Sequence, residues 1–271
     1  MRRAARFVVR ALAFALLRIS RVLERTGRGL AVASFTRSEI DGLGIAEWEA
    51  FGRDSPVDQP FAWEADLFAR YIRPGDSILL VGAGGGRDLF PLLDKGHAVT
   101  ALDIAPLALR ALSERALLRG FTVATIHASI SEAELPREAF DVVLFSWFCF
   151  SYLHGPAERR AALARSQEAL RPTGRILLSY PFRGESQPPA APASWIARVA
   201  ARLLGGMEIE PGDDYIVSGT IRRPGVFFTH PFKPRDIEEE VKGLGFPVVF
   251  HDQSAGGVGV LVLDRRPEAA R

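Results

Sequence analysis

A glycine-rich segment, Gly82-Ala83-Gly84-Gly85-Gly86, follows the apolar run 77–81 and precedes a segment with helical spacing at 87–95. A continuous apolar run of this length is typical of a strand buried on both faces of a parallel sheet. Glycines allow positive φ angles and let a ligand approach the backbone without meeting a Cβ. The following helix adds unpaired N–H groups at its N-terminus. The segment therefore predicts a strand–turn–helix unit that binds a carboxylate or a phosphate.

Apolar runs and helical segments alternate after this unit, with short loops between them. The further strands expected are 98–102, 121–126, 141–145 and 175–179. The helices expected are 61–72, 106–119 and 157–170. Alternation of this kind predicts a parallel, doubly wound α/β sheet. Residues 41–60, punctuated by glycine and proline, are expected to be irregular.

The C-terminal third departs from this alternation. A proline-rich stretch at 187–192 is typical of a linker, and a short helix is expected at 195–204. The remaining elements expected are a hairpin of 215–221 with 226–228, a helix at 233–244, and an antiparallel pair of 246–251 with 258–263. We therefore expect a domain over 41–271 with an insertion at about 183–230.

The first 40 residues form a separate, basic arm. They hold nine arginines and two glutamates, whereas the remainder holds 25 basic and 30 acidic residues. A helix is expected from Arg3 to Arg25, with apolar residues recurring along one face at Val8, Leu12, Leu16, Ile19 and Leu23. Such a helix caps the domain, lies peripherally on an anionic membrane or belongs to a targeting peptide. Arg10 and Arg18 exclude a transmembrane span.

The charge balance and the cysteine count bound the class of protein. The acidic body disfavours nucleic acid as a partner. The lone Cys149 gives no disulfide, which suits a cytoplasmic protein. The five histidines are far apart in the sequence, so no metal is expected. The sequence does not set the oligomeric state.

Asp103 ends the second strand, 21 residues after Gly82. An acid at this edge of the sheet can accept hydrogen bonds from both hydroxyls of a ribose, and it can also cap the next helix. A dinucleotide fingerprint would need glycine where Arg87 stands, which argues against an NAD(P)-dependent reductase. A P-loop is excluded because no Gly-Lys-Ser/Thr sequence follows the turn.

Residues 77–104 and 167–181 together resemble the motifs of class I S-adenosylmethionine-dependent methyltransferases. The resemblance implies a Rossmann-like doubly wound sheet of seven strands, mostly parallel with an antiparallel C-terminal strand, and S-adenosylmethionine as cofactor. The cofactor-binding residues that it implies are Gly82, Ala83, Gly84, Gly86, Asp103, Ile104, Ser129, Ile130, Ser146 and Trp147.

Two positions depart from the pattern of that superfamily. Leu80 stands where an acid is common, and Ser129 where an acid often binds the adenine amine. These departures leave open a catalytically inactive binding or scaffold protein with the same fold. Asp88, in the Gly-Arg-Asp sequence after the turn, either supports the turn or binds the cofactor.

The aromatic-rich loop 146–154 should enter the site after the fourth strand. Aromatic residues there suit contact with adenine and a small, apolar acceptor, methylated by in-line displacement. The acceptor would be lipid-like if the N-terminal helix meets a membrane. The candidate substrate contacts are Trp63, Phe150, Tyr152 and Tyr180. His154 is the candidate general base, although it also begins a helix. The alternative for the aromatic residues is core packing.

Overall fold

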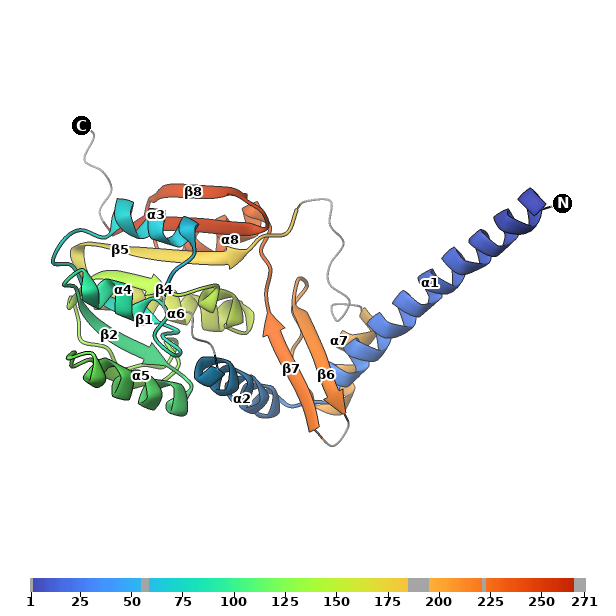
Figure 1. Cartoon of the computed structure of the whole chain (residues 1–271), viewed down its shortest axis with the longest axis horizontal. Helices are drawn as coiled ribbons and strands as arrows, with labels where there is room; N and C mark the ends of the chain where they lie inside the picture. The colour runs from blue at the N-terminus through green and yellow to red at the C-terminus, as the bar shows by residue number, and fades with distance from the viewer. Residues whose placement is uncertain (1, 55–58, 185–194, 221–222, 266–271) are drawn as a thin grey trace. The chain divides into compact units, whose positions relative to one another are not determined.

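The structure, a computed structural model, describes residues 2–54, 59–184, 195–220 and 223–265 (Figure 1). It contains two compact units. The larger comprises Gly44–Gln187 with Thr229–Arg271, and the smaller Met1–Leu43 with Pro188–Phe228. The predicted linker at 187–192 lies outside the described residues.

The larger unit is built on a seven-stranded sheet with the order β3-β2-β1-β4-β5-β9-β8. Its strands are β1 (Ser77–Val81), β2 (Ala98–Asp103), β3 (Ala124–His127), β4 (Phe140–Phe145), β5 (Leu170–Pro181), β8 (Val248–Ala255) and β9 (Val258–Asp264). Neighbouring strands from β3 to β5 are parallel, and β9 is antiparallel to both β5 and β8. The predicted mostly parallel α/β sheet with an antiparallel C-terminal strand is confirmed.

Helices cover both faces of this sheet (Figure 1). One face carries α3 (Ala62–Tyr71), α4 (Leu89–Asp94) and α5 (Pro106–Leu118), and the other carries α6 (Gly155–Ala169) and α8 (Pro234–Lys242). The packing of strand β1 explains why its sequence is apolar throughout. Leu79 and Val81 belong to one core, while Ile78 and Leu80 belong to the other, so both sides of the strand are buried.

The strand order reverses at β1, which lies between β2 and β4. In doubly wound sheets, the crevice at such a point, beyond the carboxyl ends of the strands, is where ligands bind. The glycine-rich turn leaves β1 at this edge, and Asp103 ends β2 beside it. The fold therefore places these two sequence features together.

The prediction that residues 41–60 are irregular is wrong over their first part, because α2 spans Arg37–Asp54. Glycine inside a helix costs roughly 1 kcal/mol relative to alanine, which tertiary contacts can offset. Trp48 of α2 lies 5.1 Å from Tyr152, ring centroid to ring centroid. Glu49 accepts a hydrogen bond from the Leu107 N–H at 3.2 Å.

The start of the strand expected at 175–179 also differs from the structure. Strand β5 begins at Leu170, which pairs with Phe140, and the register with β4 shifts before Val142 pairs with Arg175. The segment is therefore an irregular beginning of the strand.

The smaller unit joins two segments that lie far apart in the sequence. It holds α1 (Arg2–Ala33), the first part of α2, α7 (Trp195–Leu204) and the hairpin of β6 (Asp214–Thr220) with β7 (Arg223–Thr229). Its buried core consists of Val32, Ala33, Ile40, Ala197, Ala201, Met207, Ile209, Tyr215, Val226 and Phe228. The expected arm 1–40 and most of the expected insertion 183–230 therefore belong to one unit. Within the ranges that the structure describes, every helix is too short or too polar to cross a bilayer.

Candidate functional site

The glycine-rich turn has a backbone that side chains would disfavour. Gly82, Gly84 and Gly86 have φ angles of 72°, 49° and 95°, in the region that glycine enters most readily. The N–H groups of Gly82 and Ala83 both donate to the carbonyl of Leu102, at 2.8 and 3.2 Å. A Cβ built on Gly84 would meet no heavy atom within 4 Å. The turn is thus tied to β2 while the space over Gly84 stays open.

Asp103 fastens the middle of this turn. Its carboxylate accepts the N–H of Gly84 at 2.7 Å and the N–H of Ala105, before α5, at 2.9 Å. Burial raises the pKa of Asp103, against the opposing effect of these hydrogen bonds. Each carboxylate oxygen has two lone pairs and uses one in these bonds. Holding the turn is therefore compatible with accepting hydroxyl groups of a ligand.

Three other predicted cofactor residues, Ile104, Ser129 and Ile130, differ in how far they are exposed to a ligand. Ile104 follows Asp103 and is 40% exposed. The hydroxyl of Ser129 lies 2.8 Å from that of Ser131, and Ile130 is buried in the core. The carbonyl of Asp103 accepts the Ala128 N–H at 3.2 Å, which brings this loop to the same edge of the sheet.

A buried ionic network lies behind the turn and consists of Glu64, Arg87, Asp88 and Ser146. The Arg87 guanidinium donates to both carboxylate oxygens of Glu64, at 2.5 and 2.6 Å. Arg87 Nη2 also lies 3.0 and 2.9 Å from the two oxygens of Asp88. The Ser146 hydroxyl donates to Asp88. The network connects α3, the glycine-rich turn and the end of β4.

This network decides between the two interpretations of Asp88. The Asp88 side chain is wholly buried and its Oδ2 accepts hydrogen bonds from Arg87 and Ser146, so it supports the turn. Burial, reinforced by the charge of Glu64, raises its pKa from 3.8 to about 6, although Arg87 and Ser146 act in the opposite direction. The hydroxyl of Ser146, which is predicted to bind the cofactor, donates its hydrogen bond to Asp88 in this network.

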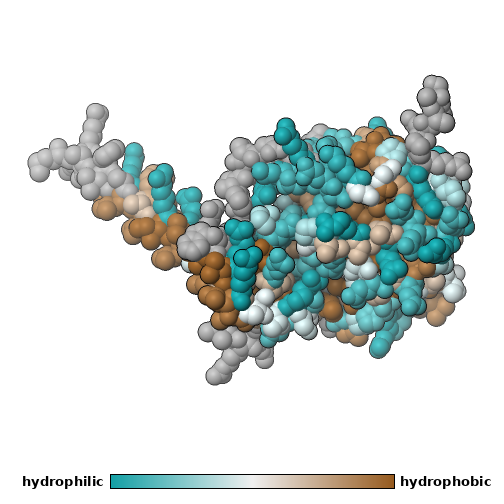
Figure 2. Space-filling view, turned by 180° about the vertical axis from the view of Figure 1, so that it is seen from behind, coloured by the Kyte–Doolittle hydropathy of each residue, from teal (hydrophilic) through white to brown (hydrophobic). Residues whose placement is uncertain are grey.

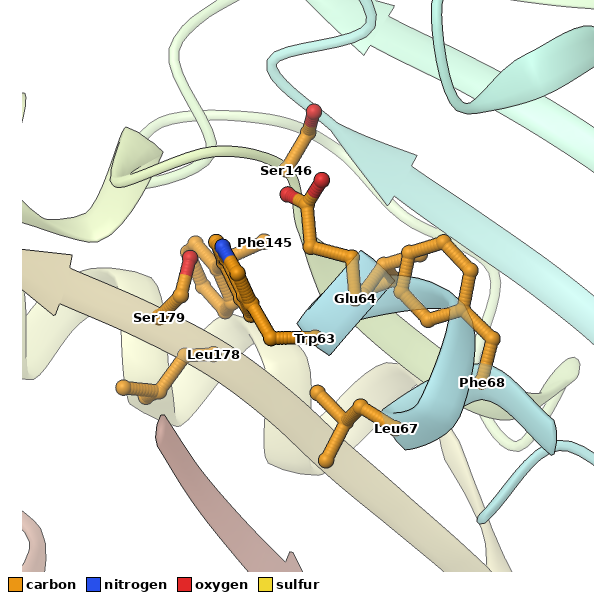
Figure 3. Close-up of a pocket in the computed structure, with 9 residues that line it drawn as sticks. Trp63, Glu64, Leu67, Phe68, Phe145, Ser146, Leu178 and Ser179 are labelled. Atoms are coloured by element: carbon orange, nitrogen blue, oxygen red, sulfur yellow. The ribbon is translucent and has the colours of Figure 1, made fainter. Parts of the chain in front are cut away.

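A small cavity opens beside the network (Figure 3). It is narrow and is lined by Trp63, Glu64, Leu67, Phe68, Leu144, Phe145, Ser146, Leu178 and Ser179. Figure 3 shows the Glu64 carboxylate pointing toward Ser146. The lining is mainly apolar, and both oxygens of its carboxylate, Glu64, are paired with Arg87.

Four aromatic rings adjoin this cavity and form an aromatic group: Phe61, Trp63, Trp147 and Phe148. The rings of Trp63 and Phe148 are nearly parallel, at 7° with centroids 6.4 Å apart. Phe61 contacts both tryptophans, with centroids 6.2 Å from Trp63 and 5.7 Å from Trp147. The Arg87 guanidinium lies over Phe61 and Trp147, at 5.0 and 5.5 Å, which ties the aromatic group to the buried ionic network.

Phe148 has a backbone conformation that is rare outside glycine. Its φ is 63°, and non-glycine residues in this region are often found at functional sites. Its N–H donates to the Ser179 hydroxyl at 3.2 Å. The bond holds the loop after β4 against the end of β5.

Cys149, Tyr152 and His154 follow in the same loop. Cys149 is half-buried, and a Cβ on Gly82 would come within 2.6 Å of its Sγ. Burial and the charge of Asp103 raise the pKa of the Cys149 thiol, so it is a poor nucleophile. Tyr152 packs against Trp48. His154 is half-buried immediately before α6, and its N–H donates to Glu158 at 3.0 Å.

Two of the candidate substrate contacts are core residues instead. Phe150 has no exposed surface and packs against Phe145 and Phe232, with centroids 5.5 and 5.8 Å away. Tyr180 is also fully buried, and its hydroxyl is hydrogen-bonded to His251 and Gln253. Burial raises the pKa of Tyr180 to about 12. The structure gives both rings a packing role.

Sequence reasoning missed the roles of Glu64 and Arg87. Glu64 lies in the first turn of α3 and accepts the N–H of Phe61 at 2.8 Å. That local signal indicates a helix start. Its pairing with Arg87, 23 residues later, had no signal in the sequence.

Comparison with known proteins covers the glycine-rich turn, Asp103 and the loop after β4. A family model for a methyltransferase domain matches residues 78–174. A nocamycin O-methyltransferase from Saccharothrix syringae is 30% identical over 64% of this chain and 60% of its own length. A ribosomal protein L11 methyltransferase from Thermus thermophilus is 35% identical over 51% of this chain and 50% of its own length. The chain thus spans about half the length of these curated relatives.

One solved structure shows how far the fold is shared. It is a Burkholderia thailandensis 1,6-didemethyltoxoflavin-N1-methyltransferase with bound 1,6-didemethyltoxoflavin and S-adenosylhomocysteine. Its TM-score is 0.56 at 21% identity, covering 84% of this chain and 89% of that one. Similarity at this level establishes a common fold.

Proposed function

Because the chain carries a class I S-adenosylmethionine-dependent methyltransferase domain, we propose that it transfers a methyl group from S-adenosylmethionine to a small organic acceptor. The observation that carries this proposal is the pairing of the open turn at Gly84 with the Asp103 carboxylate. Gly82, Ala83, Gly84 and Gly86 supply a backbone that a ligand can approach closely. Asp103, with Ile104 beside it, stands where ribose hydroxyls would be bound.

Methyl transfer mainly requires the protein to align the acceptor atom with the methyl group. S-adenosylmethionine, when bound, supplies an electrophilic methyl group for in-line displacement. The protein must hold the acceptor in line with that group and keep water away. The buried ionic network suits this task, because Arg87 fixes α3, which carries Trp63 and Glu64, against the cofactor turn.

The cavity supports an uncharged, apolar acceptor, and its aromatic walls favour one with a planar ring. Trp63, Phe68 and Phe145 supply apolar surface, and parallel aromatic rings such as Trp63 and Phe148 suit planar molecules. The pairing of Glu64 with Arg87 leaves no free carboxylate among the lining residues to hold a cationic acceptor. Acidic residues outnumber basic ones beyond residue 40, which disfavours a nucleic-acid acceptor. The nocamycin and didemethyltoxoflavin enzymes are named for small molecules, in line with this choice.

A proton acceptor is needed if the methyl group goes to a hydroxyl. We assign this role to His154, which the loop after β4 carries toward α6. The half-buried ring of Tyr152 lies earlier in that loop, and Trp147 and Ser146 begin it.

A lipid-like acceptor would suit a chain that works at a membrane surface through α1.

Calorimetric titration of S-adenosylmethionine and S-adenosylhomocysteine into the purified chain tests the proposal. We expect micromolar binding that Asp103→Ala weakens at least tenfold, because the variant loses the acceptor of the Gly84 N–H and of the ribose hydroxyls. Asp94→Ala is the matched control, since Asp94 is an exposed acid that pairs with Arg119 at the end of α4. Absence of binding at millimolar ligand would contradict the proposal. Binding without turnover on phenols and N-heteroaromatic acceptors would instead favour a binding or scaffold protein.

A further inference from the structure

Helix α1 displays a continuous row of large apolar side chains. Val9, Leu12, Leu16, Ile19 and Leu23 recur at steps of three and four residues, so they share one face. Each of the five is between 55% and 67% exposed. Val22 widens the face and is 61% exposed. Isolated apolar residues are normal on protein surfaces, but a contiguous row of this size marks an interaction site.

Arginines occupy the opposite side of the same helix. Arg10, Arg18 and Arg21 are exposed, and the acid of this region, Glu24, pairs with Arg28. Figure 2 shows this division along α1, with hydrophobic residues in brown on one side and hydrophilic ones in teal on the other. The helix is therefore amphipathic and carries a surplus of positive charge.

We propose that α1 lies along the surface of an anionic lipid bilayer, with its apolar face in the acyl boundary and its arginines at the headgroups. Arginine side chains extend along apolar surface while their charged ends reach phosphate groups. Arg10, Arg18 and Arg21 fall within the stretch that bears the apolar row, so the helix rests on the surface without crossing it. This inference concerns the smaller unit and does not depend on methyl transfer.

A second copy of the chain is the main competing occupant. The steps from Val9 to Leu23 also fit a helix pair, in which apolar residues repeat every three or four positions. A helix pair does not require the surplus of arginine, which anionic lipid complements directly. Val22, three residues after Ile19, also makes the apolar arc wider than the seam of a two-stranded pair. Charge and width therefore both favour the bilayer.

Sedimentation of the full-length chain with vesicles tests the proposal. Vesicles of phosphatidylcholine alone are compared with vesicles that contain about one third phosphatidylglycerol. We expect binding to the anionic vesicles at least tenfold tighter than to the neutral ones, and weaker binding as salt rises, because screening weakens the attraction of the arginines.

Two variants separate the apolar face from the charged face. Leu16→Ser with Leu23→Ser removes apolar area and should weaken binding to anionic vesicles at least tenfold. Arg18→Gln with Arg21→Gln should weaken it roughly fivefold for each arginine and reduce the salt dependence. Leu17→Ser is the matched control, because Leu17 is 53% exposed but lies one turn from Arg21, on the arginine side. It should change binding less than twofold.

Three results would overturn the proposal. They are absence of binding to anionic vesicles, binding that Leu16→Ser with Leu23→Ser leaves unchanged, and equal binding to neutral and anionic vesicles. Sedimentation velocity without lipid identifies the competing occupant. A dimer that these two substitutions dissociate, in a chain that does not bind vesicles, would assign the apolar face to a second copy. Circular dichroism of each variant must show unchanged helix content.

Discussion

Glu64 and Arg87 form a two-point ion pair, in which the two terminal nitrogens of the arginine lie 2.5 and 2.6 Å from the two carboxylate oxygens. The Glu64 side chain is 3% exposed and that of Arg87 is 15% exposed. The pair joins the helix that lines the cavity to the residue directly after the glycine-rich turn. A bidentate pair also fixes orientation, which a single contact would leave free.

Breaking this pair from one side should be costly. Glu64→Gln leaves the Arg87 guanidinium buried with a weaker partner, and we expect the free energy of unfolding to fall by about 3 kcal/mol. Urea denaturation measures this change. The exposed pair of Arg165 and Glu168, 3.8 Å apart, supplies the control, because Glu168→Gln should cost less than about 0.5 kcal/mol.

Replacing both partners by apolar residues distinguishes a paired charge from simple packing. Because Arg87 also neutralises the buried Asp88, both variants are made in a chain that carries Asp88→Asn. In that chain, Glu64→Leu with Arg87→Met removes both remaining charges together and should cost less than Glu64→Gln alone. Equal losses in these two variants would contradict the account of a buried charge left without its partner.

Asp88 should make stability depend on pH. Its pKa is about 6 in the folded chain and 3.8 as an ordinary carboxyl, so between these values the folded chain binds more protons than the unfolded chain. The stability contributed by this group is therefore complete below pH 3.8 and is lost as pH rises through 6. Asp88→Asn does not ionise. We expect its stability relative to the parent to improve by about 1–2 kcal/mol between pH 5 and pH 8.

Urea denaturation at a series of pH values measures this difference. Asp94→Asn, which changes an exposed acid at the other end of the helix that follows Asp88, should shift relative stability by less than about 0.5 kcal/mol over that range. A difference between Asp88→Asn and the parent that stays constant from pH 5 to pH 8 would show that Asp88 does not titrate there.

Cys149 lies so close to Gly82 that the turn has no room for a side chain at position 82. An alanine Cβ at position 82 would lie 2.6 Å from the Cys149 Sγ, at a φ of 72°. Gly82→Ala should therefore destabilise the chain by about 2–4 kcal/mol, from backbone strain and overpacking together. Gly96→Ala isolates the strain, because Gly96 has a φ of 84° and open space around it. It should cost about 1–2 kcal/mol.

The overpacking part of this loss should be recoverable. Cys149→Gly removes the clashing atoms, so we expect it to restore about 1–2 kcal/mol when Gly82→Ala is already present. Thermal denaturation of the two single variants and the double variant gives the coupling. Simple additivity of the two substitutions would mean that the contact carries no strain.

The parts of the fold that follow from sequence alone are those with local signals. The apolar run of β1, the glycines at 82–86 and the acid at the end of β2 each have a physical cause within a few residues, and the structure brings them together. Helix α2 escaped prediction because its glycines suggested a loop, while its contact from Trp48 to Tyr152 joins residues about a hundred positions apart. Pairings between distant parts of the chain have no periodic signal.

In the candidate site, too, the residues with local sequence signals were predictable, and those that depend on distant contacts were not. The turn and Asp103 were predictable because close approach and a strand-end acid impose residue types at fixed spacing. Tyr180 and Phe150 were not placed correctly, since an aromatic residue near a sheet edge suits a core as well as a pocket. Only the packing of Phe232 and the hydrogen bonds of His251 distinguish these outcomes.

Trp63 should control binding of the acceptor if the cavity is the acceptor site. Its indole lines the cavity and lies parallel to Phe148, so Trp63→Leu removes a planar wall while keeping an apolar surface. For an aromatic acceptor found by screening, we expect KM to rise about tenfold with less change in kcat. Calorimetry should give an affinity for S-adenosylmethionine within about twofold of the parent, because the glycine-rich turn and Asp103 are untouched.

The same helix offers a control for this substitution. Tyr71 ends α3 and packs against Phe250, with centroids 5.6 Å apart, and it is not among the residues that line the cavity. Tyr71→Leu should leave the acceptor KM within about twofold while changing stability by a similar amount to Trp63→Leu. If both substitutions raise KM equally, the effect comes from loosening α3, and the acceptor binds away from Trp63. A rise confined to Trp63→Leu places the acceptor against its indole, because the two variants share a helix and differ only in which ring is lost.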